Sequence, residues 1–268
     1  MQNNDGAWRA ALAGVVRAHG APNFRDLGGR ATADGRVVAP GRLYRTSAPH
    51  RLDARGAAAL GALGPAVLID LRAPAEAAAT GPGRASAALT VVSHPVGLAD
   101  DGAPGDLATP LLERYRQYLA RPAPIVAALR DLARIAPIPV VVSCFFGKDR
   151  TGVVIALALA ALGVTRTEIV ADYAASAGPT AQLIAELARD PVYAAALAST
   201  PPERLRAPAT VMATLLDHLD AGGGVTAWLD DAGLAARGRA RLADALLVAP
   251  PRADLDDPRG HRGDLGAM

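Results

Sequence analysis

The chain has 268 residues, of which 51% are apolar and 20% are charged, and its formal net charge is +2. This length suits one α/β domain with additional elements, and the small net charge, without any long run of Lys and Arg, gives no support to a nucleic-acid or membrane-surface partner. No segment reaches the ~18 consecutive apolar residues that a membrane-spanning helix needs. The N-terminal segment lacks the basic start and the cleavage site of a signal peptide, so the sequence predicts a cytoplasmic protein.

The first half of the chain alternates between helix-like and strand-like segments. Residues 6–19 have the pattern of an Ala-rich helix that ends at Gly20 and Pro22, so residues 1–22 are predicted to be a helical lead-in. Strand-sized apolar runs lie at 43–45, 66–71, 89–96 and 140–144, and helical stretches lie at 53–63, 110–120 and 122–135. This alternation predicts an α/β fold with a small central sheet flanked by helices.

Helices are expected to dominate after residue 150. An apolar helix over 152–162 ends at Gly163, and Thr165 and Glu168 have the spacing of a capping box for the next helix. Further helices are predicted at 166–176, 179–189, 208–221 and 225–247. We expect one domain over residues 23–248 with an added helical segment at about 165–225, and a disordered tail at 249–268, where Pro, Asp, Arg and Gly occur without periodicity.

The chemistry is expected in the loop that follows the strand at 140–144. Cys144 is the only cysteine, which excludes an intramolecular disulfide, and it stands between an apolar strand and the start of an apolar helix. The unpaired amides and the dipole at a helix N-terminus favour a bound anion. A cysteine that faces such amides is held as the thiolate, which is the nucleophilic form. This pattern predicts a compact anion as the ligand and the sulfur of Cys144 as a nucleophile.

Other residues of the loop support phosphate chemistry. Arg150 follows Cys144 by six residues, so its guanidinium can return to clamp two oxygens of a phosphate. Gly147 allows the backbone to approach the anion closely, and the Thr151 hydroxyl can donate to the sulfur when the sulfur leaves. A nucleotide-binding Walker loop is excluded, because Lys148 is not followed by Ser or Thr and the required upstream glycine is missing.

The run Cys144-x5-Arg150-Thr151-Gly152 resembles the signature loop of the protein tyrosine phosphatase superfamily. The sequence GKDRTG at 147–152 narrows the resemblance to the bacterial tyrosine and lipid phosphatase branch. Four further segments match this branch in the same order, namely NFRDLGG at 23–29, GRLYRTS at 41–47, IDLR at 69–72 and DYAAS at 172–176. The resemblance covers about residues 20 to 248 and implies a tyrosine phosphatase-like fold and hydrolysis through a phosphocysteine intermediate. It implies no cofactor, and no residues show metal-ligand spacing.

The resemblance also implies roles for individual residues. Cys144 is expected to be the nucleophile and Arg150 the clamp, with phosphate bound by the remaining loop residues Phe145, Phe146, Gly147, Lys148, Thr151 and Gly152. The general acid is expected to be Asp149, and Asp70, at the end of a predicted strand, is the alternative. Lys148 can also meet a second phosphate or a carboxylate of the substrate.

Several residues are predicted to support the loop. Ser143 occupies the position before the cysteine where the family usually has His, so we expect an active loop with a less stabilised thiolate. The alternative is a phosphate-binding pseudophosphatase with little or no turnover. Phe146 stands where a small residue is usual and is expected to narrow or reshape the entrance of the site.

Charged residues outside the loop have both structural and functional interpretations. Arg25 and Asp26 either form a local ion pair that braces a turn or belong to the site, and Arg45 has the same two interpretations. Arg72 is expected to pair with Glu76 or to position an acidic substrate. For Asp172, Tyr173 and His94, a structural role is favoured over a role in the site.

The sequence leaves the substrate open. The expected partners are a phosphorylated protein, a phosphoinositide or a small phosphorylated metabolite, with inorganic phosphate as the product. A sulfurtransferase also places a cysteine in an amide-lined loop and is a third hypothesis, although the Arg150-Thr151-Gly152 ending favours phosphate. Helices at about 165–225 are hypothesised to form a mobile lid over the site.

Overall fold

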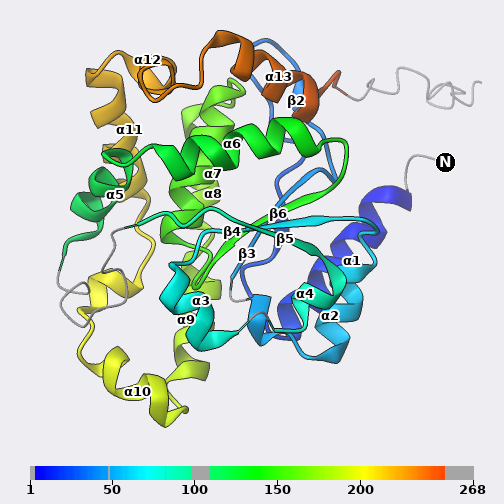
Figure 1. The fold of residues 1–268 in the computed structure, drawn as a ribbon, viewed down its shortest axis with the longest axis vertical. Coiled ribbons are helices and arrows are strands. Elements are labelled where there is room, and N and C mark those ends of the chain that lie inside the picture. The colour runs from blue at the N-terminus through cyan, green and yellow to red at the C-terminus, as the bar shows by residue number, and fades with distance from the viewer. Residues whose placement is uncertain (1–3, 48, 82, 98–108, 251–268) are drawn as a thin grey trace, which may run out of the picture.

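The computed structural model describes residues 4–47, 49–81, 83–97 and 109–250. A five-stranded sheet lies at its centre, with the strand order β1-β3-β6-β4-β5 (Figure 1). Strand β1 runs antiparallel to β3, and all the other neighbouring strands are parallel. The five strands are β1 (Arg25–Asp26), β3 (Leu43–Ser47), β4 (Val67–Asp70), β5 (Thr90–Ser93) and β6 (Val140–Cys144).

Helices cover both faces of this sheet. The short strands β2 (Val37–Val38) and β7 (Leu247–Val248) form a separate antiparallel pair. The helices are α1 (Asn4–Ala18), α2 (Ala54–Gly61), α3 (Pro74–Thr80), α4 (Ala85–Ala88), α5 (Leu111–Leu119), α6 (Ala123–Ile135), α7 (Asp149–Ala161), α8 (Arg166–Ala174), α9 (Ala177–Leu187), α10 (Pro191–Ala198), α11 (Ala209–Ala221), α12 (Gly224–Asp231) and α13 (Ala236–Leu246).

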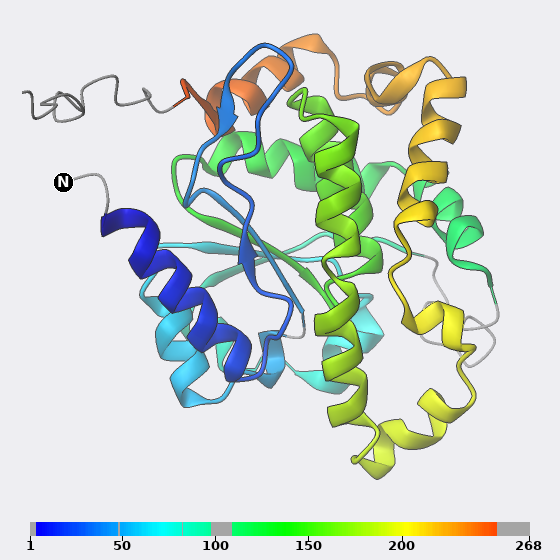
Figure 2. The same cartoon turned by 180° about the vertical axis from the view of Figure 1, so that it is seen from behind.

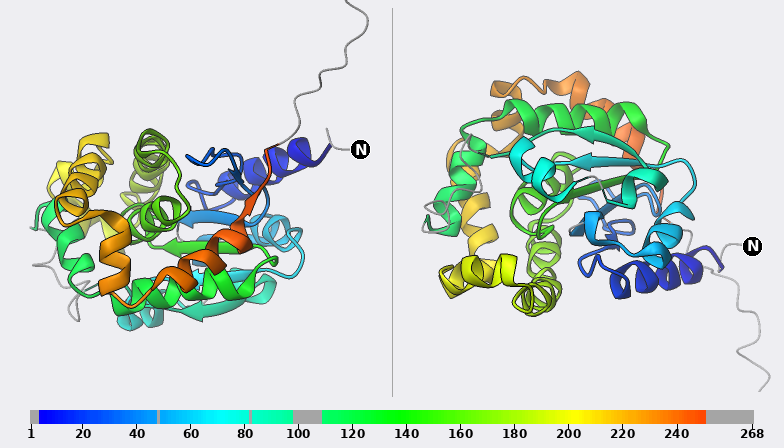
Figure 3. Two further views of the ribbon diagram at one scale, coloured as in Figure 1. Left: turned by 90° about the horizontal axis from the view of Figure 1, so that it is seen from above. Right: turned by 60° about the horizontal axis from the view of Figure 1, so that its bottom comes forward.

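The central strand β6 shows how the sheet is buried on both faces. Val140 and Val142 belong to the large apolar core shared with α5, α6, α7, α11 and α13. Val141 points the other way, into a second core with side chains of α1, α2 and α4. Figures 1 and 3 show α1 and α2 together on one side of the sheet, away from α6 and α13. Burial on both faces explains why this strand reads as a continuous apolar run rather than an alternating one.

The α/β architecture predicted from the sequence is confirmed. All four predicted strands are present as β3, β4, β5 and β6, and Thr165 caps α8 by accepting a hydrogen bond from the Glu168 amide at 3.4 Å. The single helix predicted over 225–247 is wrong, because the chain forms α12 and α13 and Gly233 between them adopts a φ of 93°. No sequence pattern predicted α3, α4 or α10.

The helical segment that follows α7 extends away from the sheet. Figure 2 shows α8 and α9 in succession along one side of the molecule, with α10 beyond them. Among the described residues, no helix combines the length and the apolar character needed to cross a membrane. Most of the predicted tail, from residue 251 onward, lies outside the described residues.

The sheet brings together the ends of three parallel strands. Cys144 at the end of β6 lies opposite Ser47 of β3, and Asp70 at the end of β4 lies opposite Ser143. Helix α7 begins at Asp149, directly after the loop that leaves β6. The carboxyl edge of parallel strands is where α/β proteins gather their sites.

Candidate active site

Cys144 is the last residue of β6, and its side chain is only 2% exposed. It lies on the same face of the sheet as Val140 and Val142, against the large apolar core. Two cations of the loop lie within electrostatic reach of this side chain: the Cys144 charge helps Glu76 to raise the pKa of Arg150, and it opposes the lowering of the Lys148 pKa by burial. The sulfur is therefore covered, yet it lies within the electrostatic reach of the loop.

Arg150 is held beside Cys144 by a two-point ion pair. Its Nη1 and Nη2 donate to the two carboxylate oxygens of Glu76 at 2.6 and 3.0 Å. Although burial acts in the opposite direction, the charges of Glu76 and Cys144 raise the pKa of Arg150 well above its ordinary value. This fork geometry fixes the orientation of the guanidinium plane. The sequence predicted Glu76 only as a partner of Arg72, because nothing local to α3 indicates that Arg150 lies opposite.

Asp149 is the first residue of α7, where the helix dipole favours a carboxylate. The Tyr115 hydroxyl donates to Asp149 Oδ1 at 2.6 Å, and the Tyr173 hydroxyl lies 2.8 Å from that of Tyr115. Burial and the charge of Asp149 raise the pKa of Tyr115 well above its ordinary value, so this hydroxyl keeps its proton. Asp149 thus has a fixed position beside the loop, and Tyr115 is a site residue that the sequence analysis missed.

Lys148 turns its ammonium group inward rather than toward the loop opening. The side chain is 1% exposed, and Nζ donates to the carbonyl oxygens of Arg204 and Arg206 at 2.5 and 2.8 Å. Burial lowers its pKa, while Asp149 Oδ1, 3.3 Å away, acts in the opposite direction. In this arrangement Lys148 connects the loop to the 3-10 turn Pro202–Leu205 and the residues after it.

Asp70 and Arg72 form a buried ion pair at the end of β4. Arg72 Nε lies 3.0 Å from both carboxylate oxygens of Asp70, and Arg72 Nη2 donates to Oδ2 at 2.6 Å. The Arg72 amide also donates to Asp70 Oδ1 at 3.0 Å. Arg72 therefore pairs with Asp70, and the expected pairing with Glu76 is wrong. With its oxygens occupied in this way, Asp70 is the weaker candidate for proton transfer.

His50 connects this ion pair to the loop. Arg72 Nη1 lies 3.1 Å from His50 Nδ1, and the His50 ring lies 5.6 Å, between centroids, from that of Phe145. Burial, with a further contribution from the charge of Arg72, lowers the pKa of His50 to about 4. His50 is therefore neutral near pH 7. No sequence pattern marked this residue.

Phe145 and Phe146 pack under the helices that follow α8. Their ring centroids are 5.1 Å apart, and Phe145 lies 5.9 Å from the Tyr193 ring of α10. Leu183 and Leu187 of α9 complete this small apolar cluster. The two aromatic side chains of the loop thus anchor α9 and α10 over it.

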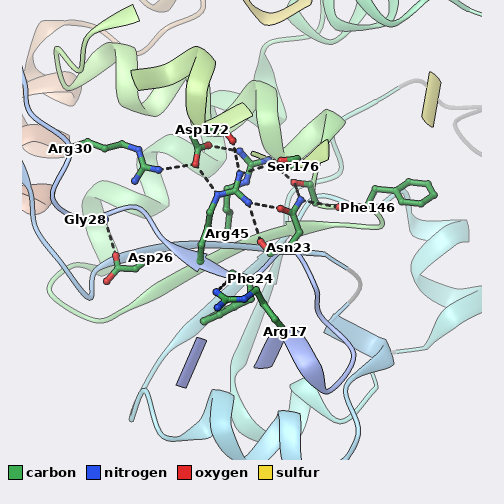
Figure 4. Close-up of polar contacts among 12 residues, drawn as sticks. Arg17, Asn23, Phe24, Asp26, Gly28, Arg30, Arg45, Phe146, Asp172 and Ser176 are labelled. Carbon is green, nitrogen blue, oxygen red and sulfur yellow. Dashed lines mark hydrogen bonds and ion pairs between the residues drawn. The ribbon is translucent and has the colours of Figure 1, made fainter. Parts of the chain in front are cut away.

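A polar network lies beneath the loop and is drawn in Figure 4. Asn23 Nδ2 donates to the carbonyl oxygens of Phe146 and Gly147 at 3.2 and 2.9 Å. Arg45 Nη2 donates to the same Gly147 oxygen at 2.5 Å, and Arg45 Nη1 donates to Asp172 Oδ2 at 2.5 Å. The structure therefore places Asn23 and Arg45 against the loop itself.

Asp172 is the common anion of three arginines. Arg25 Nε and Arg30 Nη2 each donate to its Oδ1 at 2.9 Å, in addition to Arg45. Although burial acts in the opposite direction, these arginines lower the pKa of Asp172 to about 2. Burial and the charge of Arg45 lower the pKa of Arg25 to about 10. Asp172 therefore has the structural role that was expected: its carboxylate partly neutralises the three arginines beneath the loop.

The local ion pair expected between Arg25 and Asp26 does not form. Arg25 pairs with Asp172, whereas the Asp26 carboxylate accepts hydrogen bonds from the amides of Gly28 and Gly41, each at 2.8 Å. Asp26 thus braces two turns and lies apart from the network around Asp172 (Figure 4).

Two hydroxyl groups near Cys144 are buried without a hydrogen-bond partner in the part of the chain that the structure describes. They belong to Ser143 and Thr151. Because successive residues of a strand face opposite ways, Ser143 points away from the face that carries Cys144. Because its hydroxyl has no hydrogen-bond partner among the described residues, Ser143 does not supply the organising contacts expected of His at this position.

Two glycines of the loop region are required by close packing. Gly147 has a φ of 62°, and a Cβ there would lie 2.2 Å from the Thr46 carbonyl oxygen. At Gly152, a Cβ would lie 3.0 Å from the Tyr173 ring. Gly147 lets the loop pass close to β3, and Gly152 lets α7 pack against α8.

Comparison with known families agrees with this architecture. A model described as the tyrosine phosphatase family matches residues 16–248. The chain belongs to the tyrosine phosphatase family. It is 37% identical over 204 residues to the triple specificity protein phosphatase PtpB of Mycobacterium tuberculosis (strain ATCC 25618 / H37Rv), a match that covers 63% of this chain and 71% of PtpB. It is 34% identical over 170 residues to the putative tyrosine-protein phosphatase H16_A0669 of Cupriavidus necator (strain ATCC 17699 / DSM 428 / KCTC 22496 / NCIMB 10442 / H16 / Stanier 337), which covers 60% of this chain and 62% of that protein.

The chain is therefore a phosphatase of the tyrosine phosphatase type, and the family match at 16–248 includes all of residues 23–248, over which one domain is expected. Within this phosphatase, the structure gathers Cys144, Asp149 and Arg150 around one loop. Asp70 and Arg72 lie at the end of the neighbouring strand β4 and form an ion pair with each other. Two contacts that the sequence did not predict, Glu76 with Arg150 and Tyr115 with Asp149, reach the loop from helices distant in sequence.

Proposed function

We propose that this protein hydrolyses phosphate monoesters through a phosphocysteine intermediate, with Cys144 as nucleophile, Arg150 as the phosphate clamp and Asp149 as the general acid. The observation that supports this most is the pairing of Arg150 with Glu76, because it holds a guanidinium beside the sulfur at the N-terminal end of α7. A cation, helix amides and a cysteine at one point form a site for a tetrahedral dianion.

The proposed reaction has two half-reactions. In the first, the Cys144 thiolate attacks phosphorus, the bond from phosphorus to the leaving oxygen breaks, and Asp149 gives its proton to that oxygen. In the second, water attacks the phosphocysteine, Asp149 takes a proton from the water, and the phosphorus–sulfur bond breaks to release inorganic phosphate. Thr151, whose hydroxyl is uncommitted among the described residues, donates to the departing sulfur. Such acid and base catalysis typically contributes about 10²- to 10⁴-fold in rate.

The substrates that we propose are a phosphotyrosine protein, a small phosphorylated metabolite or a phosphoinositide. The relative PtpB is named a triple specificity protein phosphatase. The rings of Phe145 and Phe146, which are only partly buried, favour an aryl or small substrate over a polyanionic head group. A nucleic-acid substrate is not expected, and cytoplasmic residence stays a prediction that cell fractionation tests.

For a substrate to reach the Cys144 sulfur, the helices that pack on the loop must move. Cys144 is 2% exposed, and α9 and α10 pack on Phe145 and Phe146. We propose that these two helices form a lid that opens for the substrate. Hydrogen exchange of α9 and α10 should change when vanadate binds, and unchanged protection of both helices would contradict the lid.

The second candidate is a phosphatase-like protein with weak or no turnover. It is favoured by the Ser143 hydroxyl, which stands where the family usually has His and has no hydrogen-bond partner among the described residues. Such a protein would bind vanadate tightly and release no phosphate. Ser143→His should then increase hydrolysis.

The decisive experiment is a turnover screen over phosphotyrosine peptides, phosphoinositides and phosphorylated metabolites. Phosphate release is measured for the wild type and for Cys144→Ser, which should abolish it. A wild type that hydrolyses no aryl phosphate from acidic to neutral pH would overturn the proposal. Sulfurtransferase activity in the same preparation would favour the third hypothesis of sulfur transfer.

A further inference from the structure

Two consecutive carbonyl groups of the Cys144–Arg150 loop accept hydrogen bonds from the buried side chains of Asn23 and Arg45. Asn23 Nδ2 donates to the carbonyl oxygens of Phe146 and Gly147 at 3.2 and 2.9 Å. Arg45 Nη2 donates to the Gly147 oxygen as well, at 2.5 Å. Asn23 is 1% exposed and Arg45 is fully buried, so water does not compete for these contacts.

Holding a carbonyl group also orients the amide that follows it. The peptide unit is planar and trans, so a C=O and the N–H of the next residue point in opposite directions. The N–H groups of Gly147 and Lys148 therefore point away from Asn23 and Arg45. A loop binds an anion only when several of its amides point toward one place.

We infer that Asn23 and Arg45 are positioning residues for phosphate binding. By pulling the carbonyl oxygens of Phe146 and Gly147 outward, they turn the amides of Gly147 and Lys148 toward the bound oxyanion. This inference rests on the proposed function, to which it adds two residues that touch neither the substrate nor the reacting atoms.

The orientation of Asn23 is itself fixed. Arg25 Nη1 donates to Asn23 Oδ1, so the amide nitrogen of Asn23 faces the loop. Arg25 Nε donates to Asp172, and Arg45 donates to the other oxygen of the same carboxylate. The two positioning residues are thus both tied to Asp172 on α8, Arg45 directly and Asn23 through Arg25. Figure 4 shows Asn23 and Arg45 side by side below Asp172.

The network also has an excess of positive charge. Arg25, Arg30 and Arg45 surround the single carboxylate of Asp172. Because Arg45 is fully buried and contacts the loop carbonyl directly, part of this excess lies immediately behind the phosphate-binding loop. A buried cation at this position stabilises an anion more than a cation in water does.

Two substitutions test the positioning role. Asn23→Asp has nearly the same shape and keeps the acceptor for Arg25, but it removes both donors to the loop. Arg45→Lys keeps the charge, but it cannot reach Asp172 and the Gly147 oxygen with a rigid fork. The matched control is Asp34→Asn, which breaks the exposed ion pair of Asp34 with Arg36 at 2.7 Å.

The measurements are the inhibition constant of inorganic vanadate, kcat and KM for an aryl phosphate, and the melting temperature. We expect each loop variant to lower kcat/KM by roughly 10- to 100-fold, which is less than the loss on deleting an oxyanion donor outright, and to weaken vanadate binding in parallel. The control should leave the vanadate inhibition constant, kcat and KM unchanged. Assays are run well below each melting temperature, where circular dichroism shows complete folding.

A purely structural role would lower the melting temperature and leave vanadate binding by the folded protein intact. The inference is overturned if either folded variant keeps both kcat/KM and vanadate affinity within about threefold of wild type, a difference below 1 kcal/mol. If the wild type binds vanadate without turnover, the proposed function fails, while the vanadate comparison still tests the positioning role. If the wild type binds no oxyanion, both are refuted.

Discussion

The ion pair between Glu76 and Arg150 offers a quantitative test of the site. Each of its two hydrogen bonds joins charged groups, at 2.6 and 3.0 Å, and the two side chains are only 18% and 12% exposed. A hydrogen bond to a charged group is worth about 1.5–3 kcal/mol, and about 1.4 kcal/mol corresponds to tenfold in rate. Glu76→Gln keeps one acceptor and loses the charge, so we expect kcat/KM to fall by about tenfold. Glu76→Ala loses both contacts, together about 3 kcal/mol or more, and should lower it by at least about 100-fold.

The assay is hydrolysis of an aryl phosphate with vanadate inhibition measured in parallel, because Arg150 is expected to bind both the substrate dianion and its analogue. Glu113→Gln is the matched control, since Glu113 lies 3.9 Å from Arg116 in a pair with side chains 52% and 41% exposed. Such exposed pairs contribute little. If Glu76→Gln and Glu76→Ala both keep kcat/KM within about threefold of wild type, Arg150 does not depend on Glu76 and the reasoning fails.

Three further predictions follow from the site. Tyr115→Phe removes the donor at 2.6 Å from Asp149, so the free energy of unfolding should fall by about 1–3 kcal/mol in urea melts. An unchanged free energy of unfolding would contradict a stabilising contact between Tyr115 and Asp149. Since the pKa of His50 is lowered to about 4 in the folded protein, the unfolded chain binds this proton first, and the free energy of unfolding should fall as pH drops from about 6.5 to about 4. His50→Gln should flatten this slope, and an identical slope in both proteins would contradict the assignment. Ser143→Ala should leave stability unchanged or raise it by up to about 1 kcal/mol, because the hydroxyl has no partner among the described residues, whereas the control Ser47→Ala removes an acceptor 3.2 Å from the Asn23 amide and should destabilise.

The fold was predictable where the pattern of residues is local. The apolar runs at 66–71 and 140–144 appear as β4 and β6, and the capping pair Thr165 and Glu168 begins α8. Predictions failed where a single glycine or a weakly apolar stretch decided the outcome. Gly233 interrupts the helix expected over 225–247, and the Ala-rich segments that became α3, α4 and α10 lack a clear apolar face.

Residues of the site were predictable only within the loop. The spacing of Cys144 and Arg150 is a local constraint, because six residues must close around one anion. The partner of Arg150 is Glu76, 74 positions earlier, and the partner of Asp149 is Tyr115, 34 positions earlier. No local pattern specifies such contacts. The same holds for Lys148, whose ammonium binds the carbonyl oxygens of Arg204 and Arg206 and not solvent.

The sequence by itself determined the strand, the loop and the helix that carry the candidate nucleophile, since apolar periodicity, glycine and helix-start chemistry act between neighbours in the chain. Only the tertiary structure decided which charges meet. Parallel strand pairing brings β3, β4 and β6 to one edge, and burial there makes an unpaired charge costly, so each arginine takes the carboxylate that packing places within reach. Arg25 therefore pairs with Asp172 rather than with its neighbour Asp26, and Arg72 pairs with Asp70 rather than with Glu76.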